Sequence, residues 1–170
     1  MVSVLTAISD TTRRLTPTVS TLALLVLSFV HLPLPYVSSV MPPLALMGVF
    51  YWAVYRPDRF GILAAFLVGL LQDLLMGAPL GVTAFLYALA HRLLWQQQRF
   101  FRGGSFWQLW LGYVVTQAIV SLGQWIAWSL LDGAVYNPMP FILQLLLALC
   151  LYPPIGWLLN RIHSAFVNKL

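Results

Sequence analysis

Asp73 is the one acidic residue of this sequence that lies within a long apolar stretch. A carboxylate in lipid costs several kcal/mol unless protein or water faces it, and it can then exchange a proton, hold a ligand or accept hydrogen bonds. Gly81 and Val82 begin the next apolar stretch, and N–H groups at a helix start attract a carboxylate. Arg92 is two turns deeper, on the order of 12 Å away, too far for an easy ion pair. We expect Asp73 to fix a helical hairpin, with proton or ligand handling as the alternative.

Small residues recur every four positions on the two stretches that flank this carboxylate. The spacing puts them on one helix face, and small faces let a second helix approach closely in lipid. If a tight turn at 77–79 folds the stretches antiparallel, Asp73 is expected level with Ala84 and Gly69 level with Ala88. The spaced residues are Gly61, Ala65, Gly69 and Asp73 on the first stretch, and Ala84, Ala88 and Arg92 on the second.

A second polar stripe consists of Gln117, Ser121 and Gln124, within the apolar stretch 106–131. Amide and hydroxyl side chains on one helix face form hydrogen bonds across helices in membranes. Two interpretations stay open. The stripe bonds within the bundle, which we favour, or it receives the single transmembrane helix of a partner.

The other polar residues offer no catalytic or metal-binding set. His31, His91 and His163 lie on separate stretches without the spacing of metal ligands. Ser105 has no plausible base or acid partner, and an intramembrane enzyme needs a nucleophile and a base at one depth. We therefore expect no enzymatic activity and no cofactor. Cys150, the only cysteine, is expected to be a small buried hydrophobic residue.

The composition is that of a membrane protein. Of the 170 residues, 61% are hydrophobic, only 8% are charged, and none is Glu. A soluble domain carries about a quarter charged residues, because it must wet its surface. The net charge of +5 is spread in ones, twos and threes between apolar runs, which argues against nucleic acid as a partner and for the lipid bilayer.

Six stretches are long enough to cross a membrane, since a span takes about 17–25 mostly apolar residues. They predict an all-α integral membrane protein, a compact bundle of six transmembrane helices at 15–160. Residues 1–14 are a cytoplasmic leader, expected as a frayed tail, and 161–170 are a cytoplasmic tail. Pro42-Pro43 and Pro153-Pro154 should kink or break their helices. The predicted spans are 15–32, 36–55, 60–76, 80–97, 106–131 and 140–160.

The basic residues predict the orientation. All nine Lys and Arg sort to one side of the six spans, and the opposite connectors 33–35, 77–79 and 132–139 carry none. By the positive-inside rule that side is cytoplasmic, so both termini are expected in the cytoplasm. The nine residues are Arg13, Arg14, Arg56, Arg59, Arg92, Arg99, Arg102, Arg161 and Lys169.

Three motifs resemble the bacterial MreD family of rod shape-determining proteins. They are Tyr51-Trp52 near the end of an apolar span, the loop 56–59 with the sequence Arg-Pro-Asp-Arg, and a G-x-x-x-D-x-x-x-G-x-P-L-G segment. Length and helix count match across about residues 15–165. The residues of the third motif are Gly69, Asp73, Gly77, Pro79 and Gly81.

The resemblance implies a non-enzymatic scaffold in the bacterial inner membrane. It implies action in the cell-wall elongation complex beside MreC, with MreB filaments and the synthase of RodA and a class B penicillin-binding protein. It also implies a fold similar to the substrate-binding subunits of energy-coupling factor transporters.

The alternative function is that of a vitamin-binding substrate subunit of an energy-coupling factor type transporter. The proline pairs and Asp73 favour it. Those subunits present an A-x-x-x-A face on the first span, whereas here Leu27 follows Ala23 at that spacing. A test for a bound vitamin in the purified protein would distinguish the scaffold function from the vitamin-binding function.

Overall fold

The computed structural model describes residues 2–29 and 42–167 of the chain. The described residues form α-helices and one π-helical segment, η1, and contain no strand, so the protein is all-helical as predicted. The predicted ends of the first two spans at 30–32 and 36–41, the connector 33–35, His31 and Lys169 lie outside the described residues. The helices are α1 (Val2–Ser28), α2 (Leu44–Tyr55), α3 (Ile62–Met76), α4 (Val82–Arg102), α5 (Phe106–Leu131) and α6 (Met139–Ile162), followed by η1 (His163–Val167).

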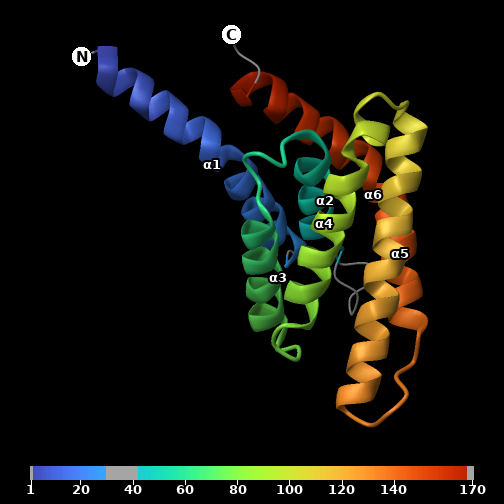
Figure 1. The fold of residues 1–170 in the computed structure, drawn as a ribbon. Coiled ribbons are helices and arrows are strands. Elements are labelled where there is room, and N and C mark those ends of the chain that lie inside the picture. Colours follow the sequence, from blue (N-terminus) through green and yellow to red (C-terminus); the bar gives the residue numbers. More distant parts are fainter. Residues whose placement is uncertain (1, 30–41, 168–170) are drawn as a thin grey trace.

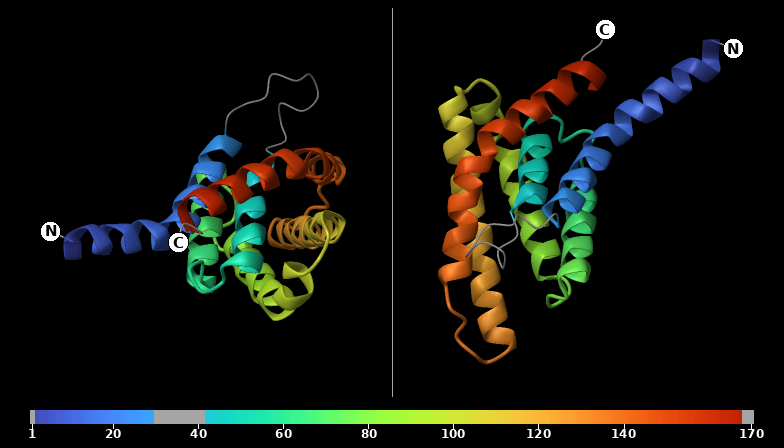
Figure 2. Two further views of the ribbon diagram at one scale, coloured as in Figure 1. Left: turned by 90° about the horizontal axis from the view of Figure 1, so that it is seen from above. Right: turned by 180° about the vertical axis from the view of Figure 1, so that it is seen from behind.

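The short helix α2 occupies the centre of the bundle (Figures 1 and 2). It contacts α1, α4, α5 and α6, and its residues from Leu44 to Val54 are all buried. A helix that is apolar on every side is stable only when other elements surround it. At its middle, the Phe50 ring makes edge contacts with Phe101, Tyr113 and Tyr152, at centroid distances of 5.6–5.9 Å.

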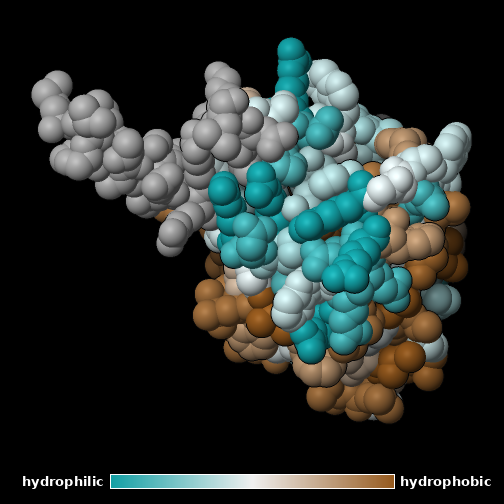
Figure 3. All heavy atoms as spheres, turned by 45° about the horizontal axis from the view of Figure 1, so that its top comes forward, coloured by the Kyte–Doolittle hydropathy of each residue, from teal (hydrophilic) through white to brown (hydrophobic). Residues whose placement is uncertain are grey.

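The connections sort to the two ends of the bundle. The loops at 56–61 and 103–105 lie at the end where α1 begins and α6 finishes, and the turns at 77–81 and 132–138 lie at the other end (Figure 1). Hydrophilic residues gather at the first end, and the surface beyond them is apolar (Figure 3).

Two helices extend beyond the predicted spans. Residues 2–14 are not the expected frayed tail, because α1 begins at Val2, and its first part projects away from the other helices (Figure 1). Helix α4 continues past the predicted span 80–97 to Arg102, and only 103–105 separate it from α5. Good helix formers such as Gln96, Gln97 and Arg99 extend α4 beyond the apolar stretch.

The two proline pairs behave differently. Pro42 and Pro43 precede α2, so this helix begins after the pair. Pro153 and Pro154 lie inside α6, which continues through them. Figure 2 shows its C-terminal part, in red, inclined to its orange N-terminal part. A proline removes a backbone donor and its ring pushes the preceding turn aside, which bends a helix that packing holds together.

Within the described residues, two helices are long and apolar enough to cross a membrane by length and composition, Phe106–Leu131 and Met139–Ala165. The apolar helices Leu15–Ser28, Leu44–Tyr55 and Ile62–Met76 are shorter. At 1.5 Å per residue, α2 measures about 18 Å, less than the ~30 Å of a bilayer core. Six complete spans therefore stay a prediction. Cys150, expected to be buried, is exposed on α6.

Candidate functional site

The turn between α3 and α4 requires its glycines. Gly77 ends α3 at φ 64° and Gly81 precedes α4 at φ 96°, both in the left-handed region that side chains with a Cβ disfavour. The Asp73 carbonyl accepts hydrogen bonds from the N–H groups of Gly77 and Ala78, which closes the end of α3. Pro79 accepts a bond from the Val82 N–H at 3.4 Å. The predicted turn residues thus form one connected unit.

The side chain of Asp73 closes the start of α4. It is 1% exposed, and its Oδ2 accepts hydrogen bonds from the N–H groups of Gly81 at 2.9 Å and Thr83 at 3.1 Å. The sequence pointed to Gly81 and Val82, but the Val82 N–H bonds to Pro79 and Thr83 takes its place. The carboxylate satisfies donors that a helix start leaves without an intrahelical partner, and its negative charge faces the positive end of the helix dipole.

At Gly69 the backbones of α3 and α4 approach each other closely. A Cβ on Gly69 would lie 2.6 Å from the Cα of Ala84 and 2.8 Å from the carbonyl oxygen of Thr83. The predicted register is therefore wrong, because Gly69 faces Ala84 instead of Ala88. The segment 77–81 returns alongside α3 before α4 begins, since the Gly81 N–H already bonds to Asp73. The first turn of α4 is therefore level with Gly69, and Asp73 reaches that turn through its side chain.

Gln72 and Tyr87 also belong to the site, although neither was predicted from the sequence. The Tyr87 hydroxyl donates to Oε1 of Gln72 at 2.7 Å, and both side chains are buried. This bond joins α3 to α4 one residue away from Asp73. The signal available in the sequence was a glutamine inside an apolar stretch, directly before Asp73.

The stripe on α5 is buried inside the bundle. Gln124 Nε2 donates to the Thr83 hydroxyl at 3.0 Å, while the Thr83 backbone N–H is bound to Asp73. Thr83 thereby links α5 to the α3–α4 turn, a connection that the sequence did not indicate. Gln117 Nε2 donates to the Ser121 hydroxyl at 2.9 Å, within α5.

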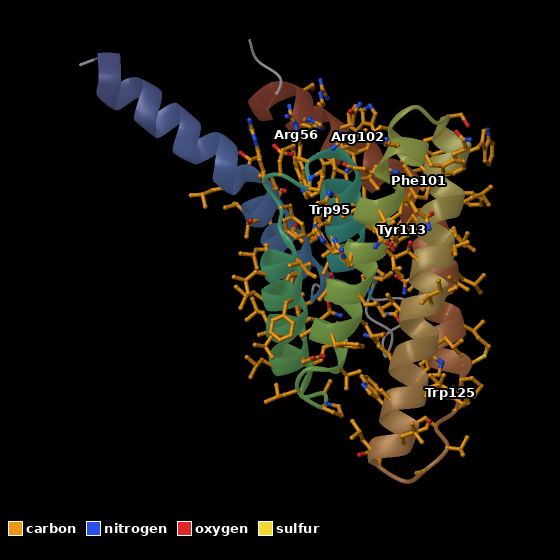
Figure 4. The ribbon with its side chains drawn as sticks, viewed as in Figure 1. Arg56, Trp95, Phe101, Arg102, Tyr113 and Trp125 are labelled. Atoms are coloured by element: carbon orange, nitrogen blue, oxygen red, sulfur yellow. The ribbon has the colours of Figure 1, made fainter. Side chains whose placement is uncertain are left out.

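Gln117 also belongs to the aromatic centre of the bundle. Tyr113 donates to its Oε1 at 3.3 Å, and the Tyr113 hydroxyl lies 3.5 Å from the Pro43 carbonyl oxygen. The Phe50 ring of α2 contacts both Tyr113 and Phe101, which are labelled in Figure 4. The two parts of the stripe thus bind different neighbours. Gln124 bonds to Thr83 of the hairpin, whereas Gln117 bonds within α5, to Ser121 and to Tyr113.

The residues of the first two sequence motifs join α2 to other helices. Trp52 Nε1 donates to the Ser20 hydroxyl of α1 at 2.9 Å. The Tyr51 hydroxyl oxygen lies 3.2 Å from Nδ1 of His163, and Arg56 Nε donates to Nε2 of the same ring at 3.4 Å. His163 therefore binds protein groups through both nitrogens, which sequence spacing could not indicate.

The arrangement holds helices together, and each polar group of the site is a hydrogen-bond partner of another. Among residues 2–29 and 42–167, no group of three or more His, Cys, Asp or Glu side chains could hold a metal ion. Nε2 of the buried His91 lies 2.7 Å from the Phe60 carbonyl oxygen, at hydrogen-bond distance.

The fold and the site define an all-helical protein whose apolar helices are joined through buried polar side chains. This pattern is typical of helices embedded in lipid. The chain belongs to the MreD family, because residues 10–162 match the family model of the rod shape-determining protein MreD. This is a family of membrane proteins with a role in determining rod shape. No curated protein and no solved structure matches the chain. The three motifs noted in the sequence lie within the matched residues.

Proposed function

We propose that the chain is a non-enzymatic scaffold of the cell-wall elongation complex in the bacterial inner membrane. It maintains rod shape by interacting with MreC and, through the complex, with MreB filaments and the RodA–class B penicillin-binding protein synthase. The match to the MreD family over residues 10–162 is the observation that carries this proposal.

The proposed topology has six transmembrane helices with both termini in the cytoplasm. The distribution of the basic residues supports it. So does the arrangement of the bundle, in which the loop 56–61, with Arg56 and Arg59, and the last turn of α4, which ends at Arg102, lie at the end where α1 begins (Figure 1). The proposed similarity to the substrate-binding subunits of energy-coupling factor transporters rests on the family resemblance alone.

The proposed role of the site is to hold the helices that partners contact. Gly69, Asp73, Gly77, Pro79 and Gly81 act in helix packing at the α3–α4 turn. Their hydrogen bonds and close contacts support this role. Gln117, Ser121 and Gln124 act in packing as well, because their partners lie within the bundle.

Outward-facing apolar side chains on α5 and α6 are the proposed surface for lipid and partner helices. Exposed apolar side chains are unfavourable in water, whereas in a membrane they pack against lipid or against a neighbouring helix. Examples are Leu111, Val115, Ile119 and Leu122 on α5 and Ile142, Leu146 and Leu158 on α6.

Depletion in a rod-shaped host tests the function. The cells should become round, a plasmid copy should restore rods, and a tagged copy should retain MreC from native membranes. Normal shape combined with lost vitamin uptake would support the transporter alternative instead.

Reporter fusions test the topology. Fusions at the N-terminus, near Arg102 and at Leu170 should report a cytoplasmic location, and fusions near Pro79 and Tyr136 a periplasmic one. A periplasmic C-terminus would contradict the topology.

A further inference from the structure

The basic end of the bundle contains a polar hollow of about 460 Å³ between the end of α2 and the last turns of α4. Arg56, Asp58, Trp95, Gln98 and Arg102 contribute to its wall. None of them belongs to the α3–α4 turn or to the α5 stripe. Figure 4 shows Arg56 and Arg102 at that end of the bundle and Trp95 further along α4, toward the apolar part.

Arg102 is held in place by the protein. Its Nε donates to the Val54 carbonyl at 2.9 Å, and a terminal nitrogen donates to the Tyr55 carbonyl at 3.1 Å. A guanidinium carries five N–H donors, so two bonds fix the group and leave others for a ligand. Arginine fixed in this way binds phosphate oxygens at little further cost in side-chain entropy.

Gln98 adds an amide to the same wall. Its Oε1 is buried and has no hydrogen-bond partner. Rotation of the amide about χ3 offers either its oxygen or its NH2 group to a ligand. Asp58, which lies 3.8 Å from Arg59, contributes one negative charge to a wall that otherwise carries positive charge. The hollow therefore suits a phosphate that also carries hydrogen-bond donors.

Apolar surface continues from the hollow along the membrane-facing side. Pro57 and Trp95 line both the hollow and a second cavity of about 350 Å³, whose wall includes Ile62. Ile62 and Leu63 are exposed on α3. The Arg92 guanidinium lies 4.9 Å from the centre of the Trp95 ring. Trp and Arg at such a boundary are typical of the lipid headgroup level.

We propose that this hollow binds the headgroup of a membrane phospholipid, one whose phosphate is esterified to a group with hydrogen-bond donors such as glycerol. Arg56 and Arg102 bind the phosphate, while Asp58 and Gln98 accept from the headgroup hydroxyls. The acyl chains lie along Trp95 and the exposed face of α3. Basic pockets between membrane helices hold anionic lipids by the same chemistry.

Lipid binding to the purified full-length protein tests the proposal. The protein is delipidated in neutral detergent, and native mass spectrometry counts retained phosphatidylglycerol or phosphatidylcholine with identical acyl chains. Phosphatidylglycerol should bind more tightly. Arg56→Gln and Gln98→Leu should each weaken it, Arg56→Gln by about tenfold, the loss of one charge-assisted contact. If Arg56→Gln fails to fold, the Gln98→Leu result decides.

Arg99→Gln is the matched control, because Arg99 is exposed on the same turns of α4 and does not line the hollow. It should leave binding unchanged. Equal weakening by Arg99→Gln would overturn the proposal in favour of diffuse surface charge. Equal retention of the two lipids would overturn it as well. Displacement of the lipid by millimolar glycerol 3-phosphate would indicate a soluble ligand. Displacement of the lipid only by an acidic partner peptide would indicate a protein.

Discussion

The α3–α4 hairpin and the α5–α6 pair are held together by different chemistry. In the hairpin, a buried carboxylate binds backbone N–H groups, a tyrosine binds a glutamine, and Gly69 lets the backbones approach. In the pair, rings do most of this work: Tyr113 and Tyr152 stack with centroids 4.5 Å apart, and Trp128 meets Phe141 at 5.8 Å.

The turn ends of the two regions also differ in how completely their buried polar groups are paired. Near the α3–α4 turn, Asp73, Gln72 and Thr83 all have hydrogen-bond partners, and the unpaired atoms of α4, in His91 and Gln98, lie further along the helix. On α5, the buried Trp128 Nε1 and Ser129 Oγ have none. Polar pairing demands fixed geometry, whereas ring contacts tolerate small shifts. We therefore expect the hairpin to be the more sensitive region to substitution.

The largest effect is expected from Gly69→Leu. Its Cβ would meet the backbone of Ala84 and Thr83, which cannot move unless the helices separate and the bonds of Asp73 break. We expect a loss of about 4 kcal/mol or more in the free energy of unfolding. Thermal unfolding in detergent, followed by size-exclusion chromatography, measures it. Gly61→Leu is the control, because nothing lies within 4 Å of a Cβ there; equal stability of the two variants would contradict the close approach.

Asp73→Leu is expected to come next. It leaves the N–H groups of Gly81 and Thr83 without their acceptor, at a cost of about 2–3 kcal/mol. Asp73→Asn keeps an acceptor oxygen and should be milder. Levels of folded protein in the membrane provide the measurement.

The same two variants separate packing from partner contact. If both accumulate normally yet fail to support rod shape or to retain MreC, Asp73 contacts a partner. Normal shape and normal levels with Asp73→Leu would remove this carboxylate from the site altogether.

A pair of tyrosine substitutions sharpens the comparison directly. Tyr87→Phe leaves the buried Gln72 Oε1 unpaired and should cost about 1–2 kcal/mol. Tyr113→Phe keeps the stacked ring and loses only longer hydrogen bonds, so we expect about 0.5 kcal/mol. Unfolding of both variants under one set of detergent conditions is the measurement. A larger loss for Tyr113→Phe than for Tyr87→Phe would contradict the expectation that polar pairing matters more in the hairpin.

The smallest effect concerns the exposed turn of the α5–α6 pair. The Tyr136 hydroxyl donates to the Asp132 carboxylate, and this hydrogen bond together with the negative charge raises the pKa of Tyr136 above its ordinary value. The protonated phenol is favoured in the folded state, so this contribution is complete below the ordinary pKa of about 10 and is lost as pH rises through the folded pKa. Absorbance of tyrosinate, compared with Tyr136→Phe, should show late titration; Asp132→Asn should shift it to lower pH, and an unchanged curve would refute the bond.

Local signals were enough to locate the hairpin. Gly77, Pro79 and Gly81 mark a turn through their own backbone preferences, and a lone carboxylate before a helix start indicates where its bonds go. The stretch 106–131 coincides with α5 because apolar length and its flanking Gly and Ser define a helix locally.

Other predictions failed where the answer depended on neighbours. The register of Gly69 depends on how far the 77–81 turn carries the chain before α4 begins, which spacing alone does not encode. The helical leader and the extension of α4 to Arg102 were missed because hydrophobicity was read as the limit of each helix, while polar residues continue a helix equally well.

The sequence by itself determined that this protein is helical and apolar and where its α3–α4 turn lies, because composition, glycine and proline act through local chemistry. Only the tertiary structure decided that Thr83 joins Asp73 to Gln124, that Arg102 closes the end of α2, and that Tyr113 stacks on Tyr152. These contacts join residues far apart in the chain. Their partners are chosen by helix packing, and helix packing depends on every side chain of the bundle at once.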